Sequence, residues 1–158
     1  MHRSKNQKGF SLIELLIVVA IIGVIAAMAI PNLLASRRAA NEASAIGGMR
    51  TISSSQAVYQ VTSLNGLYAN GLTALRNSNI IDSTLGGGTK SGYSYVCFAS
   101  TTAPARFVAT ARPTTTSGTT RTGERQFEVD ESGVIYANAG TKANATAIRS
   151  ATGTAIGN

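Results

Sequence analysis

The hydrophobic pattern begins with an almost wholly apolar run over residues 10–30. As a helix rising about 1.5 Å per residue, its 21 residues span roughly 30 Å, which is the thickness of the hydrocarbon core of a bilayer. Glu14 is the only ionisable residue in this run, and Pro31 follows its last residue. The pattern therefore predicts a helix that crosses a membrane.

Residues 31–61 are more polar, but their apolar positions still follow a helical period. One mostly apolar face recurs at spacings of three or four residues and consists of Ile46, Met49, Ile52, Gln56 and Tyr59. Such a period is typical of an amphipathic helix that packs on a domain. We therefore predict one long helix that spans the membrane in its first half and is amphipathic in its second.

Beyond the helix, the pattern changes to short segments separated by turn signals. Residues 62–92 form a connecting region with Asn-Gly and Gly-Gly steps, and residues 93–139 contain three to four segments of alternating apolar and polar side chains. This alternation predicts an antiparallel sheet with one face toward the amphipathic helix. Residues 140–158 are poor in large apolar side chains and are predicted to be a flexible tail. The predicted fold class is α+β, with a long N-terminal helix packed on a small antiparallel sheet.

Charge is distributed unevenly along the chain. The formal net charge of +7 comes from 14 basic and seven acidic residues, and three of the basic ones, Arg3, Lys5 and Lys8, precede the apolar run. This bias favours a cytoplasmic N-terminus with the rest of the chain outside. If those three residues are removed with a leader, 11 basic residues face seven acidic ones, which leaves a net charge of +4. The other basic residues are scattered singly and do not alternate with aromatic side chains, which argues against nucleic acid as a partner.

Few residues suited to catalysis or metal binding are present. Cys97 is the only cysteine and His2 the only histidine, so neither an internal disulfide nor a zinc or iron site can be assembled. Four acidic residues gather between Glu124 and Glu131, near one predicted hairpin, but no pair of nucleophile and base can be identified. We therefore expect no enzymatic activity, no metal and no cofactor.

A distinct motif surrounds the start of the apolar run. The segment KGFSLIELL, residues 8–16, follows a short basic leader and places Gly9 directly before Phe10, with Glu14 four residues further on. This arrangement resembles the processing site of type IV pilins and of the pseudopilins of type II secretion systems. The resemblance implies that a prepilin peptidase removes a leader of residues 1–9, cutting between Gly9 and Phe10, and that Phe10 becomes N-methylated.

The same resemblance implies a location and a set of partners. The subunit would first lie in the inner membrane, surrounded by lipid, with a cytoplasmic N-terminus and a periplasmic folded part. An inner-membrane assembly platform would then add it to identical subunits in a homopolymeric extracellular filament. The expected function is therefore that of a structural pilin.

Glu14 is the residue with the clearest predicted role in assembly. A carboxylate inside a membrane helix costs about 2.5–3.5 kcal/mol on insertion scales, so such residues are usually functional and paired. Cleavage would create a charged amine at Phe10, roughly 6 Å away along a helix. Pairing within one chain and pairing between neighbouring subunits both stay open, and the second would also fix the axial offset of the neighbours. The alternative is a protonated Glu14 tolerated near the edge of the bilayer.

A weak point in the helix is predicted at Pro31. This proline has no N–H to donate to the carbonyl of Ala27, so the helix should kink or fray there. Gly23, a weak helix former, lies eight residues earlier. In filaments of the family resembled, the segment before this proline can unwind, and from the residues alone an ordinary kink and such unwinding are equally compatible.

Two other functions compete with that of a pilin. An ordinary secreted protein with a signal peptide fits the small residues at Ala27-Met28-Ala29, but Glu14 would interrupt an apolar region that is also longer than a signal requires. A mature chain that starts at Phe10 would indicate a filament subunit, and one that starts at Ile30 would indicate secretion. The other alternative is a pseudopilin, for which the family comparison expects an acidic calcium-binding loop near the C-terminus. The tail has no acidic residue, which favours a pilin.

Overall fold

The computed structural model describes residues 9–100, 102, 104–139 and 154–156. The chain divides into two compact units, Met1–Ser36 and Arg37–Asn158, and each has its own structure. The described part of the first unit is almost entirely helical, and the second unit contains the rest of that helix and the sheet. Except for Gly9, the predicted leader lies outside the described residues.

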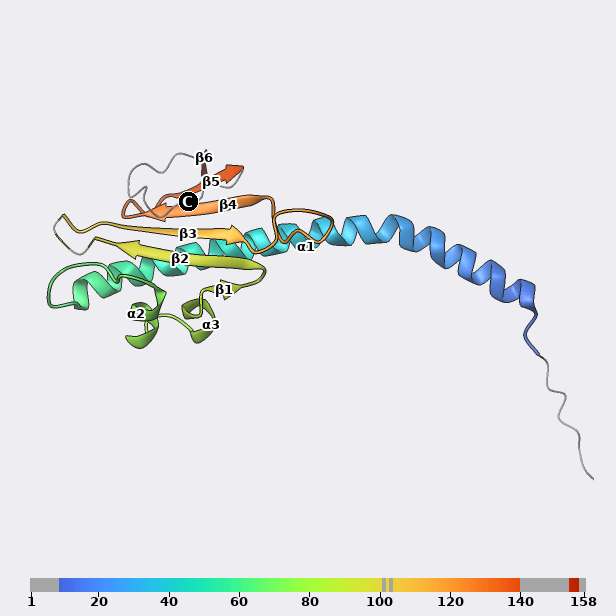
Figure 1. Ribbon diagram of the computed structural model, residues 1–158, viewed down its shortest axis with the longest axis horizontal. Coiled ribbons are helices and arrows are strands. Elements are labelled where there is room, and N and C mark those ends of the chain that lie inside the picture. The colour runs from blue at the N-terminus through green and yellow to red at the C-terminus, as the bar shows by residue number, and fades with distance from the viewer. Residues whose placement is uncertain (1–8, 101, 103, 140–153, 157–158) are drawn as a thin grey trace, which may run out of the picture. The chain divides into compact units, whose positions relative to one another are not determined.

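The first helix, α1 (Leu12–Thr62), has 51 residues and continues through Pro31 (Figure 1). Near the proline, the side-chain amide of Asn32 donates a hydrogen bond to the carbonyl of Met28 at 3.2 Å. The backbone is assigned as helical from Gly23 to Pro31 without a break. Unwinding of this segment therefore stays a prediction for the assembled filament.

The second unit contains an antiparallel meander whose strand order follows the sequence. The strands are β1 (Thr89–Lys90), β2 (Tyr93–Ala99), β3 (Phe107–Pro113), β4 (Arg125–Asp130), β5 (Ile135–Ala139) and β6 (Thr154–Ile156). Two short helices, α2 (Leu72–Asn77) and α3 (Ser83–Gly86), precede β1 in the chain. The second half of α1 runs along the sheet (Figure 1). The predicted α+β fold is confirmed.

The sheet has six strands instead of the three to four that were predicted. The additional strands β1 and β6 have only two and three residues, too few to show an alternating pattern in the sequence. β6 pairs with β5 and lies within the segment predicted to be a flexible tail. Most of that tail lies outside the described residues.

The core of the second unit lies between α1 and the sheet. The helix face predicted from the sequence is confirmed, because Met49, Ile52 and Gln56 are fully buried while Ile46 and Tyr59 are partly buried against the core. On the sheet, every second residue of β2 is buried. The largest buried side chains contributed by the rest of the unit are Leu75, Leu85, Tyr93, Phe127 and Val129.

Gln56 is a polar residue inside this core, and its amide is fully used. The Nε2 atom donates to the carbonyl of Ala69 at 2.9 Å, and the Oε1 atom accepts from the N–H of Ala69 at 2.8 Å. The same Nε2 atom lies 2.9 Å from the Sγ atom of Cys97. Burial raises the pKa of the Cys97 thiol to about 11, so this side chain stays protonated and packs as a small hydrophobe. Gln56 thus connects α1 to the segment before α2 without leaving a buried polar group unpaired.

Candidate functional site

The first part of α1 presents a continuous apolar surface that the rest of the described chain does not cover. The large apolar side chains of residues 10–30 range from 48% exposed at Val18 to 83% exposed at Phe10. By length and composition, α1 could cross a membrane. An apolar surface of this size is unfavourable in water, so it requires lipid or neighbouring protein.

Half of a capping box defines where this helix begins. The Oε2 atom of Glu14 accepts a hydrogen bond from the backbone N–H of Ser11 at 2.9 Å. The carbonyl of Ser11 accepts the first helical hydrogen bond, from the N–H of Leu15 at 3.3 Å. A glutamate three residues after a serine is well placed for this contact, and its negative charge suits the N-terminal end of the helix dipole. The sequence analysis did not include this role of Glu14, although the Ser-x-x-Glu spacing could have indicated it.

The predicted cut site lies in non-helical backbone directly before this capped start. Gly9 and Phe10 have no regular secondary structure, so the helix begins two residues after the start of the apolar run. A Cβ atom placed at Gly9 would meet no other atom of the described chain within 4 Å. Packing within the chain therefore does not require a glycine here, and an extended backbone at this position would be open to a protease.

The contacts of the other predicted site residues leave their roles untested. The carboxylate of Glu14 contacts the Ser11 N–H, and Phe10 still carries a peptide nitrogen instead of the free amine that cleavage would create. Pairing of Glu14 with that amine stays a prediction. Gly23 and Pro31 lie on the exposed helix, and a Cβ atom at Gly23 would meet no atom of the described chain within 4 Å.

A buried carboxylate joins the second half of α1 to the start of β4. The Oε1 atom of Glu42 accepts from the backbone N–H of Glu124 at 2.9 Å and from that of Arg125 at 3.1 Å. Its Oε2 atom accepts from the Nε atom of Arg125 at 2.8 Å. Burial by itself raises the pKa of Glu42, but these donors outweigh it and hold the pKa below the ordinary value. We call this group, Glu42 with Glu124 and Arg125, the Glu42 clamp, and the sequence analysis did not predict it.

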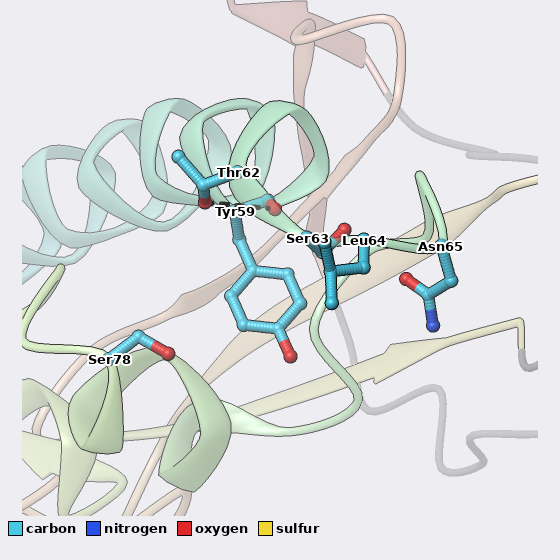
Figure 2. Close-up of a pocket in the computed structure, with 6 residues that line it drawn as sticks. All are labelled: Tyr59, Thr62, Ser63, Leu64, Asn65 and Ser78. Carbon is cyan, nitrogen blue, oxygen red and sulfur yellow. Dashed lines mark hydrogen bonds between the residues drawn. The ribbon is translucent and has the colours of Figure 1, made fainter.

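A shallow hollow of about 410 Å³ lies at the C-terminal end of α1 (Figure 2). Its lining residues are Tyr59, Thr62, Ser63, Leu64, Asn65 and Ser78. The Thr62 hydroxyl donates to the carbonyl of Val58 at 2.9 Å, and the Ser63 hydroxyl to that of Leu67 at 3.0 Å. The Thr62 hydroxyl thus bonds a carbonyl of the last helical turn and the Ser63 hydroxyl bonds the loop that follows, and the lining residues include no acid–base pair. Within the described ranges, no three His, Cys, Asp or Glu side chains come together to hold a metal ion.

Comparison with known proteins identifies the segment at the start of the helix. Residues 4–30 match the prokaryotic N-terminal methylation motif. The chain carries this motif. The methylation motif includes the predicted cut site and Glu14, and it ends at the last residue of the apolar run.

Similar proteins include pilus subunits and a secretion component. The chain is 45% identical over 71 residues to the type IV wide pilus major component of Thermus thermophilus, covering 45% of this chain and 53% of that protein. It is 56% identical over 48 residues to a type IV major fimbrial protein of Dichelobacter nodosus, covering 28% and 31%. It is 30% identical over 61 residues to the type II secretion system core protein G of Escherichia coli, covering 39% and 42%. The match thus spans about half or less of the length of these relatives.

These relatives and the methylation motif confirm the resemblance to type IV pilins and to pseudopilins. No solved structure shows a significant match to the chain. Two of these relatives are named as a major pilus component and as a major fimbrial protein. In this chain, the described part of the methylation motif includes the exposed apolar start of α1.

Proposed function

We propose that this chain is a pilin, the structural subunit of a type IV pilus, which is assembled from the inner membrane into a helical filament. The observation that carries the proposal is the exposed apolar start of α1, which bears the methylation motif and continues into a folded α+β unit. Lipid would cover this surface before assembly, and the packed helices of neighbouring subunits would cover it afterwards. The similarity to a wide pilus component and to a major fimbrial protein supports the same function. We also propose that the chain is not an enzyme.

The proposed maturation begins with prepilin peptidase, which cuts between Gly9 and Phe10 and methylates the new amine. The capped helix start leaves these two residues in non-helical backbone, which supports access by a protease. The basic charge of the leader would keep this segment at the cytoplasmic face of the membrane. The amine stays protonated after methylation and needs a negatively charged partner in an apolar filament core. Glu14 is the carboxylate nearest to it in the sequence.

The mature subunit should begin at Phe10 and carry one added methyl group. Intact-mass measurement of subunits from sheared filaments tests this, and the variant Gly9→Val should keep the leader because a β-branched side chain hinders entry of the backbone into the protease. Gly23→Val is the matched control, since it makes the same replacement outside the cut site. Wild-type subunits that start at Met1 or at Ile30 would contradict the proposed processing.

The similarity to the secretion core protein G supports a second candidate, a pseudopilin of a type II secretion system. Deletion of the gene separates the two functions when surface filaments and exported proteins are measured in the same cells. We expect filaments to disappear while export continues at the normal level. Loss of export with surface filaments retained would assign the chain to the secretion system instead.

A further inference from the structure

Two groups of charged residues of the second unit lie at opposite ends of the sheet. At the end near the Glu42 clamp, Arg38 and Arg121 both contact the Glu124 carboxylate, at 3.4 Å and 2.9 Å. Arg125 contacts Glu42 at 2.8 Å. We call this end the collar, and its charged residues are Arg37, Arg38, Glu42, Arg121, Glu124 and Arg125. Four basic side chains against two acidic ones leave the collar with an excess of two positive charges.

Arg37 is the collar residue whose side chain is most accessible to a charged partner. It is exposed, and among the residues that the structure describes no ion pair or hydrogen bond is recorded for it. It immediately precedes Arg38 on the helix, so it lies at the same end as the shared Glu124 carboxylate. A guanidinium here can form two parallel hydrogen bonds to an incoming carboxylate.

The β4–β5 turn at the opposite end of the sheet carries two acidic residues. A Cβ atom at Gly133 in this turn would approach the Ser53 hydroxyl of α1 to 3.8 Å. Ser53 lies 16 residues along the helix from Arg37, which corresponds to about 24 Å. The turn itself carries Asp130 and Glu131, and Arg106 lies beside Glu131. Arg50 lies one helical turn before Ser53 on α1. The collar therefore carries an excess of positive charge, and the β4–β5 turn at the other end carries two carboxylates.

Glu131 is only weakly engaged within its own chain. Its Oε1 atom lies 3.9 Å from the Nε atom of Arg106, and the two side chains are 41% and 51% exposed. An exposed pair at this distance contributes little to stability. The neighbouring carboxylate of Asp130 instead accepts from the N–H and the hydroxyl of Ser132 and holds the turn.

We propose that the collar of one subunit contacts the β4–β5 turn of a second copy of this chain, with Arg37 facing Glu131. The inference rests on the proposed function, because it concerns how identical subunits stack along a filament. A head-to-tail contact between identical units joins different surfaces and produces an open polymer, not a closed pair. This arrangement brings the basic collar of each unit to the acidic β4–β5 turn of the next, whereas contact between two collars would juxtapose like charges.

The second copy is a better partner for the collar than anionic lipid. The complementary acidic turn is present on the same chain, at the far end of the same unit, and is repeated once for each subunit. The mature chain has a net charge of +4, so subunits repel one another unless local opposite charges meet at the contact. Pairing of the ends would offset that repulsion and set the axial register.

Charge reversal tests the contact in the full chain. Cells expressing Arg37→Glu or Glu131→Arg should yield filaments reduced by about fivefold or more, because each change replaces an attraction with a repulsion at every subunit. The double variant with both reversals should recover most of the yield, since opposite charges face each other again. Arg76→Glu is the control, because it makes the same change in net charge at an exposed residue of α2 that belongs to neither the collar nor the β4–β5 turn.

The outcomes distinguish the proposed contact from lipid binding and from a failure of the proposed pilin function. Normal filament yield from Arg37→Glu would overturn the contact while leaving the proposed pilin function intact, provided that the subunits start at Phe10. A loss that Glu131→Arg does not restore would assign the collar to lipid headgroups and would also overturn the proposal. Absence of filaments from the wild-type chain would instead count against the proposed function itself.

Discussion

The variant Glu14→Ala is expected to enter the membrane and to be processed, but its filament yield should fall by at least roughly a hundredfold. Removing the carboxylate makes the helix more apolar, so residence in the bilayer should not suffer. The protonated amine of Phe10, however, would move into an apolar filament core without its proposed partner. Loss of one partner of a buried charge pair typically costs about 3–5 kcal/mol, and this penalty would recur at each subunit added.

Two further replacements separate the charge of Glu14 from its role in the capping box. Glu14→Gln keeps an oxygen that can accept the Ser11 N–H but removes the negative charge. If pairing with the amine drives assembly, this variant should fail as completely as Glu14→Ala. Glu14→Asp should be intermediate, because it keeps the charge on a side chain that is shorter by one methylene.

Filament yield and the amount of processed subunit in the membrane fraction should be measured together for these variants. Equal amounts of processed subunit would show that insertion and cleavage are unaffected, so that a loss of filaments reports assembly alone. Normal yield from Glu14→Gln would mean that only the cap matters. Normal yield from Glu14→Ala would require the pairing mechanism to be abandoned.

The variant Glu42→Ala is expected to lower the free energy of unfolding of the second unit by about 2–3 kcal/mol. The Glu42 side chain is 11% exposed, and its loss would remove the acceptor of two backbone N–H groups and of the Arg125 guanidinium. Glu124→Ala is the matched control, because that carboxylate is 54% exposed and its contacts with Arg38 and Arg121 should contribute about 1 kcal/mol or less. Denaturant unfolding of the full chain in detergent measures both, and equal effects would contradict the importance of the Glu42 clamp.

The contribution of Glu42 should also depend on pH. Burial raises the pKa of Glu42, but hydrogen bonds from the Glu124 N–H and from Arg125 lower it further, so it lies below the ordinary value of 4.5. Since the folded chain binds this proton less tightly than the unfolded chain, the stabilisation is complete above about pH 4.5 and is lost as the pH falls through the lower folded pKa. The difference in unfolding free energy between the wild type and Glu42→Gln should therefore be constant near neutral pH and shrink in acid. Asp82, whose pKa is also lowered, is present in both chains and cancels in that difference.

Features that depend on neighbours in the sequence were open to prediction from the chain itself. The apolar run over residues 10–30 and the face of α1 around Met49 and Ile52 follow from composition and from a helical period. The motif around Gly9 was identified by its resemblance to the processing site of a known family. These signals need no knowledge of distant contacts, because residues three or four apart on a helix always share a face. The capping contact between Glu14 and Ser11 is equally local, and its spacing could have been recognised.

Only the tertiary structure decided which distant parts of the chain are in contact. The Glu42 clamp connects residues separated by 82 and 83 positions, and nothing in the helical pattern distinguishes this carboxylate from a solvated one. The strands β1 and β6 are recognisable only because they pair with longer strands. The opposite charges of the collar and of the β4–β5 turn likewise emerge only after folding, since the meander brings Arg121 and Glu124 beside Arg38 and carries Glu131 to the other end of the sheet. In the sequence these charged residues are separate from one another, and the order of the strands determines which of them lie at the same end of the sheet.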